Sequence, residues 1–502
     1  MTVVETFKQL SGSIYLDGAF RKSGASDGVD AIDPATEDVN GEVALAKVEE
    51  VDEAVANAKR AQKVWHRMNM LKRSEELHEV AHKFRKLSPK LAEALTREMG
   101  KPYKEAADEV EWTATAFDYY AEVARHENGR VVGPVVDGQF NIVTKHPLGV
   151  VGIILPFNFP FVLFGWEAGA ALGAGNAVIL KPSEITSFSS LIMMECFDHL
   201  PKGLVQCVTG AIEVGKHLVG HEGVDGIAFT GSIGGGQAVA QTCAKTFKRC
   251  LVEASGNDPF IVMPSAPVDI AAQGAVFGAY LNCGQVCAAA ERFYVHQDVH
   301  DRFVDEAVKL AKKLRIGNGL AKIDMGPLAA QRERDRYEGL LARAIDEGAK
   351  VMTGGGRPDG FNKGYFCDAT VLTGCTPDME IMNTESFGPV LPICPIRDFD
   401  EAIELANRSK YALGSCIYTR DLAETMRAIE ELEAGMTWVN STALLDNDAG
   451  PFGGRKMSGT GRQLGAEGLE QFRHSKLSMI DHECGVADYW WYPYKDAEAY
   501  PG

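Results

Sequence analysis

Between residues 150 and 253, short apolar runs alternate with segments of helical character. The apolar runs cover residues 150–154, 177–180, 205–208, 226–229 and 249–253. Strands that are apolar along their whole length are buried on both faces, so the pattern predicts a parallel sheet with helices on both sides. Such sheets bind ligands beyond the carboxyl ends of their strands, and we therefore expect functional residues there.

The chain before this region predicts turns and then long helices. Residues 1–45 contain three turn pairs, which are typical of an arm with short strands: Asp17-Gly18, Asp33-Pro34 and Asn40-Gly41. Apolar positions with a helical period then predict helices over residues 51–65, 71–84, 88–99 and 104–125. The third of these is expected to begin at Ser88-Pro89 and to stop at Gly100. Alternating polar and apolar residues from 139 to 145 predict a half-exposed strand.

A second alternation of strands and helices follows residue 256. Its strand-like runs lie near Phe260, Phe293, Val351, Val371, Ile393, Cys416 and Trp438. This pattern predicts a second α/β domain. After Gln471 the rhythm changes, and residues 476–481 predict an edge strand. The aromatic run at 489–494 indicates a contact, because a free tail seldom exposes so many rings.

Composition narrows the class of protein. A chain of 502 residues is long enough for two to four domains, at ~100–200 residues each. A net charge of −18 argues against nucleic acid or an anionic membrane as the main partner. Eleven cysteines without a Cys-x-x-Cys pair or zinc spacing predict reduced thiols in the cytoplasm and no metal site. Residues 1–10 show no signal-peptide pattern, and no apolar stretch is long enough for a membrane span.

A cysteine with a candidate base is the centre of the predicted chemistry. Cys287 ends the loop 281–287, which lies between a helix-like run and a strand-like run. Thiolate is the reactive form, and a free cysteine has a pKa of ~8.5, so a neighbouring group must activate it. Glu253, 34 residues upstream at the end of a predicted strand, is the candidate. An inert, buried cysteine is the alternative on these residues alone.

Three further strand ends carry candidate ligand-binding groups. Asn158, in the rigid loop 156–160, can donate to an oxyanion or can bond within its own turn. Gly231-Ser232 ends a strand and opens a helix, as in phosphate sites and in ordinary glycine-rich turns. Glu184, after Lys181, can accept the hydroxyls of a ribose and repel a 2′-phosphate, which favours NAD over NADP; a solvated turn is the alternative.

Taken together, the motifs resemble the NAD(P)-dependent aldehyde dehydrogenase superfamily over nearly the whole chain. Eight stretches carry the resemblance in the family's order: 156–160, 181–184, 229–232, the strand end at Glu253, 284–287, 385–390, 438–440 and 451–459. The resemblance implies an α/β fold with a Rossmann-type cofactor domain, an α/β catalytic domain and a small β oligomerisation element. We expect these parts at residues 1–127 and 149–255, at 256–470, and at 128–148 and 471–502.

The resemblance also implies roles for single residues. Cys287 attacks the aldehyde carbon, and the Asn158 amide with the Cys287 N–H holds the oxyanion. Hydride passes to the nicotinamide, and Glu253 activates the water that hydrolyses the resulting thioester. The cofactor is expected to be NAD, with NADP as the alternative. Its expected contacts are Lys181 and Glu184 at the adenosine ribose, Gly231 and Ser232 at the pyrophosphate, and Glu385 and Phe387 at the nicotinamide ribose.

Several positions depart from the family pattern. Ser255 replaces a glycine beside the nicotinamide path, and Gln463 replaces a glutamate that relays protons to the base in many members. Cys283 lies one turn before Cys287, and packing is a simpler role for it than a disulfide.

The pocket residues Phe159, Trp166 and Phe452 predict a small uncharged or aromatic aldehyde as substrate. Leu281 stands where succinic semialdehyde enzymes have an arginine, and Phe452 replaces a tryptophan of the betaine aldehyde enzymes.

One alternative function is a dehydrogenase that passes the acyl group to coenzyme A. Another is a structural, crystallin-like protein without turnover.

The resemblance further implies a homodimer or homotetramer that pairs through the sheet near 128–148 and the strand near 475–481. The tail 482–502 is longer than the usual family end, and our hypothesis is that it crosses to a neighbouring subunit.

Overall fold

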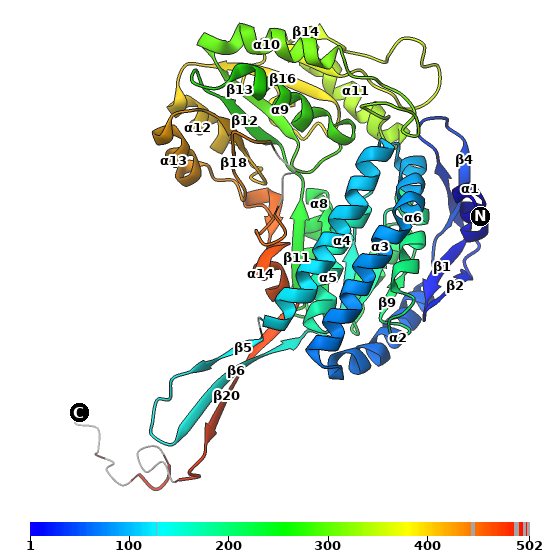
Figure 1. Ribbon diagram of the computed structural model, residues 1–502, viewed down its shortest axis with the longest axis vertical. Coiled ribbons are helices and arrows are strands. Elements are labelled where there is room, and N and C mark those ends of the chain that lie inside the picture. Colours follow the sequence, from blue (N-terminus) through cyan, green and yellow to red (C-terminus); the bar gives the residue numbers. More distant parts are fainter. Residues whose placement is uncertain (127, 443–446, 486–490, 495–497, 499–502) are drawn as a thin grey trace.

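Two α/β domains and a three-stranded arm make up the chain (Figure 1). The computed structural model describes residues 1–126, 128–442, 447–485, 491–494 and 498. The first domain holds the long helices α3 and α4, and the arm projects from its lower end. The second domain lies above it in Figure 1. In the described part of the chain, no helix combines the length and apolar character needed to cross a membrane.

The first domain is built on a sheet with the strand order β19-β11-β10-β7-β8-β9-β1-β2. Its parallel centre consists of β7 (Val150–Ile154), β8 (Ala177–Lys181), β9 (Val205–Cys207), β10 (Gly226–Gly231) and β11 (Arg249–Ala254). The antiparallel edges are β1 (Ser13–Leu16), β2 (Ala19–Lys22) and β19 (Gly459–Thr460). Every residue of β7 and β8 is buried. The predicted parallel sheet is confirmed, because only strands covered on both faces keep such continuous apolar runs.

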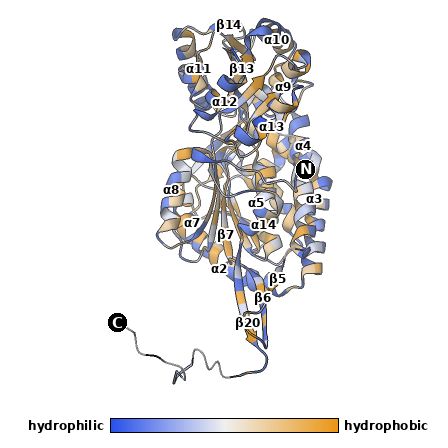
Figure 2. Cartoon of the chain, turned by 90° about the vertical axis from the view of Figure 1, so that its left-hand side faces the viewer, coloured by the Kyte–Doolittle hydropathy of each residue, from blue (hydrophilic) through white to orange (hydrophobic). Residues whose placement is uncertain are grey.

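Helices cover both faces of this sheet, as Figure 2 shows. On one side lie α7 (Ile212–Gly220) and α8 (Ile233–Ala244). On the other lie α3 (Met70–Met99), α4 (Tyr103–His126), α5 (Pro160–Ala174) and α14 (Gly465–Glu470). The remaining helices of this domain are α1 (Val3–Leu10), α2 (Val48–Arg67), α6 (Ser187–Met193), and the short 3-10 turns η1 (Glu184–Thr186) and η2 (Met194–Phe197).

Two helix predictions were wrong. The expected break at Ser88-Pro89 does not occur, because α3 runs through Pro89 to Gly100, whose left-handed backbone ends it. Leu77, Phe84 and Leu91 form one buried face across the proline, and this packing outweighs the lost hydrogen bond.

The second wrong prediction concerns the N-terminus, where α1 precedes the short strands. Thr2 and Glu5 form a capping box, a sequence signal for a helix start that was overlooked.

The second domain has a sheet with the order β14-β15-β16-β13-β12-β17-β18. Its strands contain all seven predicted runs: β12 (Asp258–Val262), β13 (Ala290–His296), β14 (Lys350–Thr353), β15 (Thr370–Thr373), β16 (Val390–Ile396), β17 (Cys416–Tyr418) and β18 (Trp438–Val439). The helical elements are α9 (Val268–Tyr280), α10 (Gln297–Ala311), α11 (Gln331–Asp346), α12 (Phe399–Asn407), α13 (Leu422–Glu431), η3 (Leu281–Gly284), η4 (Glu380–Met382) and η5 (Lys456–Ser458). Its core gathers residues between 260 and 432. Phe452, Leu464 and Leu469 instead join the first core, so the expected range 256–470 spans both cores.

The arm is an antiparallel sheet of β5 (Gly129–Val132), β6 (Gln139–Pro147) and β20 (Arg473–Asp481). It extends away from the body of the first domain (Figure 1). Val131, Phe140, Leu477 and Met479 expose large apolar side chains on it. A separate hairpin of β3 (Gly28–Ile32) and β4 (Val39–Ala44) lies near the N-terminus.

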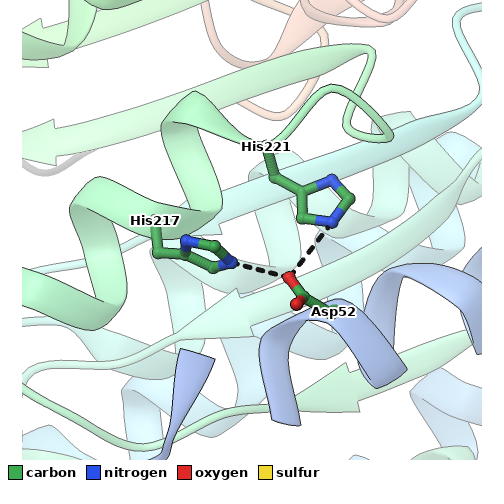
Figure 3. A group of neighbouring side chains, drawn as sticks. All are labelled: Asp52, His217 and His221. Atoms are coloured by element: carbon green, nitrogen blue, oxygen red, sulfur yellow. Dashed lines mark hydrogen bonds and ion pairs between the residues drawn. The ribbon is translucent and has the colours of Figure 1, made fainter. Parts of the chain in front are cut away.

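A cluster of Asp52, His217 and His221 joins α7 to α2 (Figure 3). Asp52 Oδ1 lies 2.6 Å from His217 Nε2 and 3.3 Å from His221 Nε2. The positions of these atoms would suit a metal ion, but His221 Nδ1 accepts the N–H of Gly223 at 2.8 Å. In neutral His221 the proton therefore lies on Nε2, which donates to Asp52 and has no lone pair for a metal. We interpret the cluster as a hydrogen-bonded link between the helices.

Candidate active site

Cys287 lies between two cavities and lines both. One cavity of about 360 Å³ is formed by strand ends of the first domain and by Glu385 and Phe387 of the second, with Asn158, Ser232 and Glu253 in its wall. The other, of about 100 Å³, is largely apolar and includes Phe159, Trp166 and Phe452. A thiol in this position can contact a ligand in either cavity.

The loop before Cys287 has an unusual backbone. Asn282, Cys283 and Gly284 have φ values of 51°, 57° and 76°, so three consecutive residues are left-handed. Such a conformation is strained for the first two and persists only when the surroundings hold it. Gln285 supplies much of that support, because its side chain donates to Asn282 O at 2.9 Å and accepts from Ala329 N at 2.9 Å. The position of Cys287 is thus fixed before any ligand binds.

Hydrogen bonds join this loop to the loop of Asn158. The Asn158 Nδ2 group donates to Gln285 O at 3.1 Å, and Asn282 Nδ2 donates to Asn158 O at 3.2 Å. Lys101 Nζ also donates to Asn158 O, at 2.8 Å. An amide nitrogen carries two hydrogens, so the Asn158 amide has a second one that it can donate to another group.

A buried ion pair holds this arrangement from behind. Lys101 and Glu109 are hydrogen-bonded, and both side chains have no exposed surface. Burial lowers the pKa of Lys101, and the Glu109 carboxylate opposes that shift. Glu109 also accepts the N–H groups of Phe161 and Val162, at 2.8 and 3.3 Å, at the start of α5. A single carboxylate therefore anchors both the lysine and the helix that follows the Asn158 loop.

Glu253 is a buried carboxyl group without a fixed partner. It is 2% exposed, and neither carboxyl oxygen has a hydrogen-bond partner among the described residues. Burial raises its pKa well above the usual value, while the nearby Cys287 thiol opposes the shift. A carboxylate of raised pKa is a stronger base, which suits proton abstraction.

The Cys287 thiol is itself held neutral in this site. Burial raises its pKa well above the usual value, and the neighbouring carboxylates of Glu253, Asp258 and Glu385 raise it further. The cysteine therefore needs a base at the moment of reaction. Of the three carboxyl groups, Glu253 has the largest effect on the pKa of the thiol.

Sequence reasoning missed a buried carboxyl group beside Glu253. Glu167 on α5 accepts from Gln463 Nε2 at 2.7 Å and from the Thr230 hydroxyl at 3.2 Å. Burial raises the pKa of Glu167 to about 8, and the two hydrogen bonds oppose this shift. Gln463, which replaces a glutamate of the family pattern, thus has another glutamate, Glu167, as its hydrogen-bond partner. No sequence signal identified Glu167, because it lies in the interior of an apolar helix.

The expected cofactor residues fall into two groups. Gly231, Ser232, Glu385 and Phe387 line the larger cavity, together with Ser255. Ser232 caps α8 by accepting from Gly235 N at 3.2 Å, which leaves a glycine-rich helix start at the cavity.

Lys181 and Glu184 are not in the lining of that cavity. They lie at the end of β8, at the same edge of the sheet. There the Lys181 ammonium group donates to the carbonyls of Pro182 and Gly210 at 2.7 and 2.8 Å. Glu184 Oε1 lies 3.3 Å from Arg332 Nη1.

Arg336 is a second residue that the sequence did not indicate. Its guanidinium donates to Glu385 O at 3.2 Å and to Ser386 O at 2.7 Å, and it lines the larger cavity. It therefore fixes the loop that carries Glu385 and Phe387. Cys283 is buried in the second core, in keeping with the packing interpretation.

All three expected pocket residues line the smaller cavity. Trp166 and Phe452 are in ring contact, with centroids 4.8 Å apart. The same wall contains Trp112, Thr115 and Asp448, which sequence reasoning did not place there. Asp448 could not be found from the sequence, since it lies in a loop far along the chain from the other members.

The geometry defines a two-domain α/β protein with a cysteine held at the junction of two cavities, and similarity to known proteins identifies the family. A profile of the aldehyde dehydrogenase family matches residues 20–477. The putative aldehyde dehydrogenase DhaS of Bacillus subtilis is 36% identical over 96% of this chain and 98% of its own. A peroxisomal aminoaldehyde dehydrogenase of Pisum sativum is 35% identical over 92% of this chain and 94% of its own. The betaine aldehyde dehydrogenase of Staphylococcus aureus, solved in complex with NAD+, superposes with a TM-score of 0.93 at 30% identity, covering 97% and 98% of the two chains.

The chain belongs to the aldehyde dehydrogenase family. The resemblance stated from the motifs is therefore confirmed, and so is the expected fold class.

The close approach of Gly256 to the cysteine provides a test of the site geometry. A Cβ atom at Gly256 would collide with the carbonyl oxygen of Cys287. We expect Gly256→Ala to displace Cys287 and to lower aldehyde-dependent activity by at least ~100-fold, since small misplacements of groups in an active site have such effects. Steady-state kinetics measures this. Gly356→Ala is the matched control, because its Cβ meets nothing within 4 Å; equal losses in both variants would contradict the interpretation.

Proposed function

We propose that this protein oxidises a small aldehyde to the carboxylic acid with NAD, using Cys287 as the nucleophile, Glu253 as the base and Asn158 as the oxyanion donor. The observation that carries the proposal is the position of Cys287. Its thiol lies between an apolar cavity and a cavity walled by strand ends, with Glu253 and Asn158 in the same wall.

The first step forms a covalent bond between the enzyme and the substrate. Glu253 takes the thiol proton, and the sulfur of Cys287 attacks the carbonyl carbon to give a thiohemiacetal. The negative charge that develops on oxygen is stabilised by the Asn158 amide and by the Cys287 N–H. Since hydrogen bonds already fix both loops, these donors need little rearrangement during the reaction.

The residues of the larger cavity fit a dinucleotide. The start of α8 offers backbone N–H groups beside Gly231 and Ser232, and Gly234 faces open space, so a phosphate could approach. Glu385 and Phe387 would hold the nicotinamide ribose, and Lys181 with Glu184 the adenosine ribose. NAD, when bound, supplies the acceptor for the hydride that leaves the substrate carbon. NADP stays an alternative, because Arg332 beside Glu184 could pair with a 2′-phosphate.

The second step releases the acid. The acyl group remains on Cys287 as a thioester. Glu253 first releases the thiol proton to solvent, and it then takes a proton from a water molecule that attacks the thioester carbon. Collapse of the tetrahedral adduct expels the sulfur, which regains a proton, and gives the carboxylic acid. Transfer to coenzyme A is disfavoured, because a buried base of raised pKa next to the thioester favours hydrolysis.

We further infer the assembly and location of the protein. The first domain would bind NAD, the second would carry the nucleophile, and the arm would pair with another copy to form a homodimer or homotetramer. The exposed apolar side chains of Leu477 and Met479 on β20 support this role for the arm. The hypothesis that the tail 482–502 crosses to a neighbour falls mostly on residues outside the described ones and stays a prediction. Free cysteines throughout the chain support a cytoplasmic location.

The nucleophile and the base can be separated by substitution. Cys287→Ala should abolish aldehyde-dependent formation of NADH. Glu253→Gln should slow turnover by about 10²–10⁴-fold, the usual contribution of a general base, and should trap the acyl group on Cys287. Intact-protein mass spectrometry after incubation with aldehyde and NAD detects that adduct. Glu213→Gln, an exposed pair to Lys216, serves as the control. Undiminished turnover in Cys287→Ala would exclude the mechanism.

The raised pKa of Glu253 predicts the direction of the pH dependence. The base acts in its deprotonated form, so turnover should fall as the pH drops through the raised pKa, well above the ordinary carboxyl value of 4.5. Measuring kcat over a series of pH values gives this fall in turnover. The residual activity of Glu253→Gln should not show the same fall. A wild-type profile that stays flat down to the ordinary carboxyl range would rule out this assignment.

Assembly through the arm can be tested by mass in solution. The wild-type protein should be a dimer or tetramer, and Leu477→Asp with Met479→Asp should dissociate it, since both residues lie on one face of β20. Light scattering coupled to size exclusion gives the mass. Phe247→Asp, at a residue 98% exposed outside the arm, is the control and should change nothing. A monomeric wild-type protein would refute the proposal.

A further inference from the structure

The smaller cavity contains one acidic side chain among aromatic and aliphatic ones. Four rings face it, from Trp112, Phe159, Trp166 and Phe452, and its remaining uncharged wall is made by Thr115, Val162, Leu163 and Val286. The carboxylate of Asp448 interrupts this surface, and the Cys287 thiol lies in the same cavity. An acid in such a wall needs a physical reason, because removing a charge from water is costly without a partner.

Within the protein, Asp448 has no basic partner. No lysine, arginine or histidine forms an ion pair with it among the described residues. The neighbouring stretch 443–446, which lies outside the described residues, has no basic residue in its sequence either. Asp118 is the charged group that affects the pKa of Asp448, and it is also acidic. Its own carboxylate pairs with Arg85 and His78.

The surroundings of Asp448 offer its carboxylate few hydrogen-bond partners. Burial raises the pKa of Asp448, the Thr115 hydroxyl opposes the shift, and Asp118 adds to it. The Thr115 hydroxyl has a single hydrogen and also donates to Trp112 O at 3.0 Å, so it is a modest partner for a half-buried carboxylate, which can accept several hydrogen bonds. The group is thus suited to a cation that arrives with the substrate.

The loop that carries Asp448 is fixed on both sides. Asn447 closes a turn around it, accepting from Ala449 N with its side chain at 3.0 Å and from Gly450 N with its carbonyl at 2.7 Å. The carbonyl of Asp448 accepts from Gly465 N at 2.9 Å, at the start of α14. A carboxylate held in this way can select a ligand group by position, because it loses little freedom on binding.

We propose that Asp448 makes the aldehyde pocket selective for short substrates with a protonated amine at the end opposite the aldehyde. The ammonium group would donate to Asp448 and rest against the aromatic faces, while the aldehyde carbon reaches Cys287. Aromatic faces attract cations, and charge-assisted hydrogen bonds to a carboxylate are among the strong ones. The same carboxylate repels substrates with an acid group. The inference rests on the proposed oxidation of an aldehyde at Cys287 and replaces the uncharged substrate expected from the aromatic residues alone.

The cavity size sets the length of the substrate. About 100 Å³ encloses only a few heavy atoms, so a three-carbon aminoaldehyde suits it better than a long chain. The N–H groups of a primary amine can bond to the carboxylate, whereas a quaternary ammonium cannot. Primary amines are therefore expected to be preferred to quaternary ones.

The test compares three aldehydes of similar size: 3-aminopropanal, butanal and 3-hydroxypropanal. With NAD, kcat/KM of the wild-type protein should be at least ~10-fold higher for 3-aminopropanal than for butanal. In Asp448→Asn, which keeps the shape and removes the charge, this ratio should fall by at least ~10-fold, mainly through KM for the amine. Asp118→Asn removes a charge from the same region but not from the cavity, and should keep the wild-type ratio.

Each outcome has a distinct meaning. If butanal is oxidised but the ratio is the same in wild type and Asp448→Asn, the amine proposal is wrong while the proposed function stands. A preference for 3-hydroxypropanal over 3-aminopropanal would also overturn it, by assigning Asp448 to a neutral hydroxyl. If no aldehyde reduces NAD, the proposed function itself fails.

Discussion

The hydrogen bonds between the Asn158 loop and the Cys287 loop are the constraint on which the site depends. One loop follows a strand of the first domain, and the other follows a helix of the second. Asn158, Asn282 and Gln285 bond across the gap, and Lys101 fixes the Asn158 carbonyl from the interior. This link between the domains holds three left-handed residues in a row, and it places a thiol and an amide side by side.

Burial determines the electrostatics of this junction. It raises the pKa of Cys287 and of Glu253, so both groups are harder to ionise here than in water. The same exclusion of water strengthens every hydrogen bond that forms when charge develops on the substrate. The ion pair of Lys101 and Glu109 is tolerated in this interior because each charge has several partners: the lysine has a carbonyl and a ring, and the glutamate has two helix N–H groups.

The strands of both domains could be predicted because their pattern is local. Residues 150–154 are apolar without interruption, and they form β7 with the same bounds. The break expected at Pro89 failed because a proline signal is also local, while the long buried face of α3 is held by packing against α4. The helix at residues 3–10 could have been predicted from Thr2 and Glu5, since a capping box needs only neighbouring residues. In the first case tertiary packing outweighed a local signal, and in the second case the local signal alone was sufficient.

The sequence by itself determined the family, the order of the strands along the chain and the residue types at each strand end, because these follow from spacing and local periodicity. Tertiary structure alone decided which side chains meet. It brought Glu167 to Gln463, across 296 positions, and Asp448 to the aromatic wall formed by α4 and α5. It also decided that Lys181 and Glu184 stay outside the cavity of Ser232. Such contacts depend on how helices and loops fold back over the sheet, and no repeating pattern along the chain encodes that geometry.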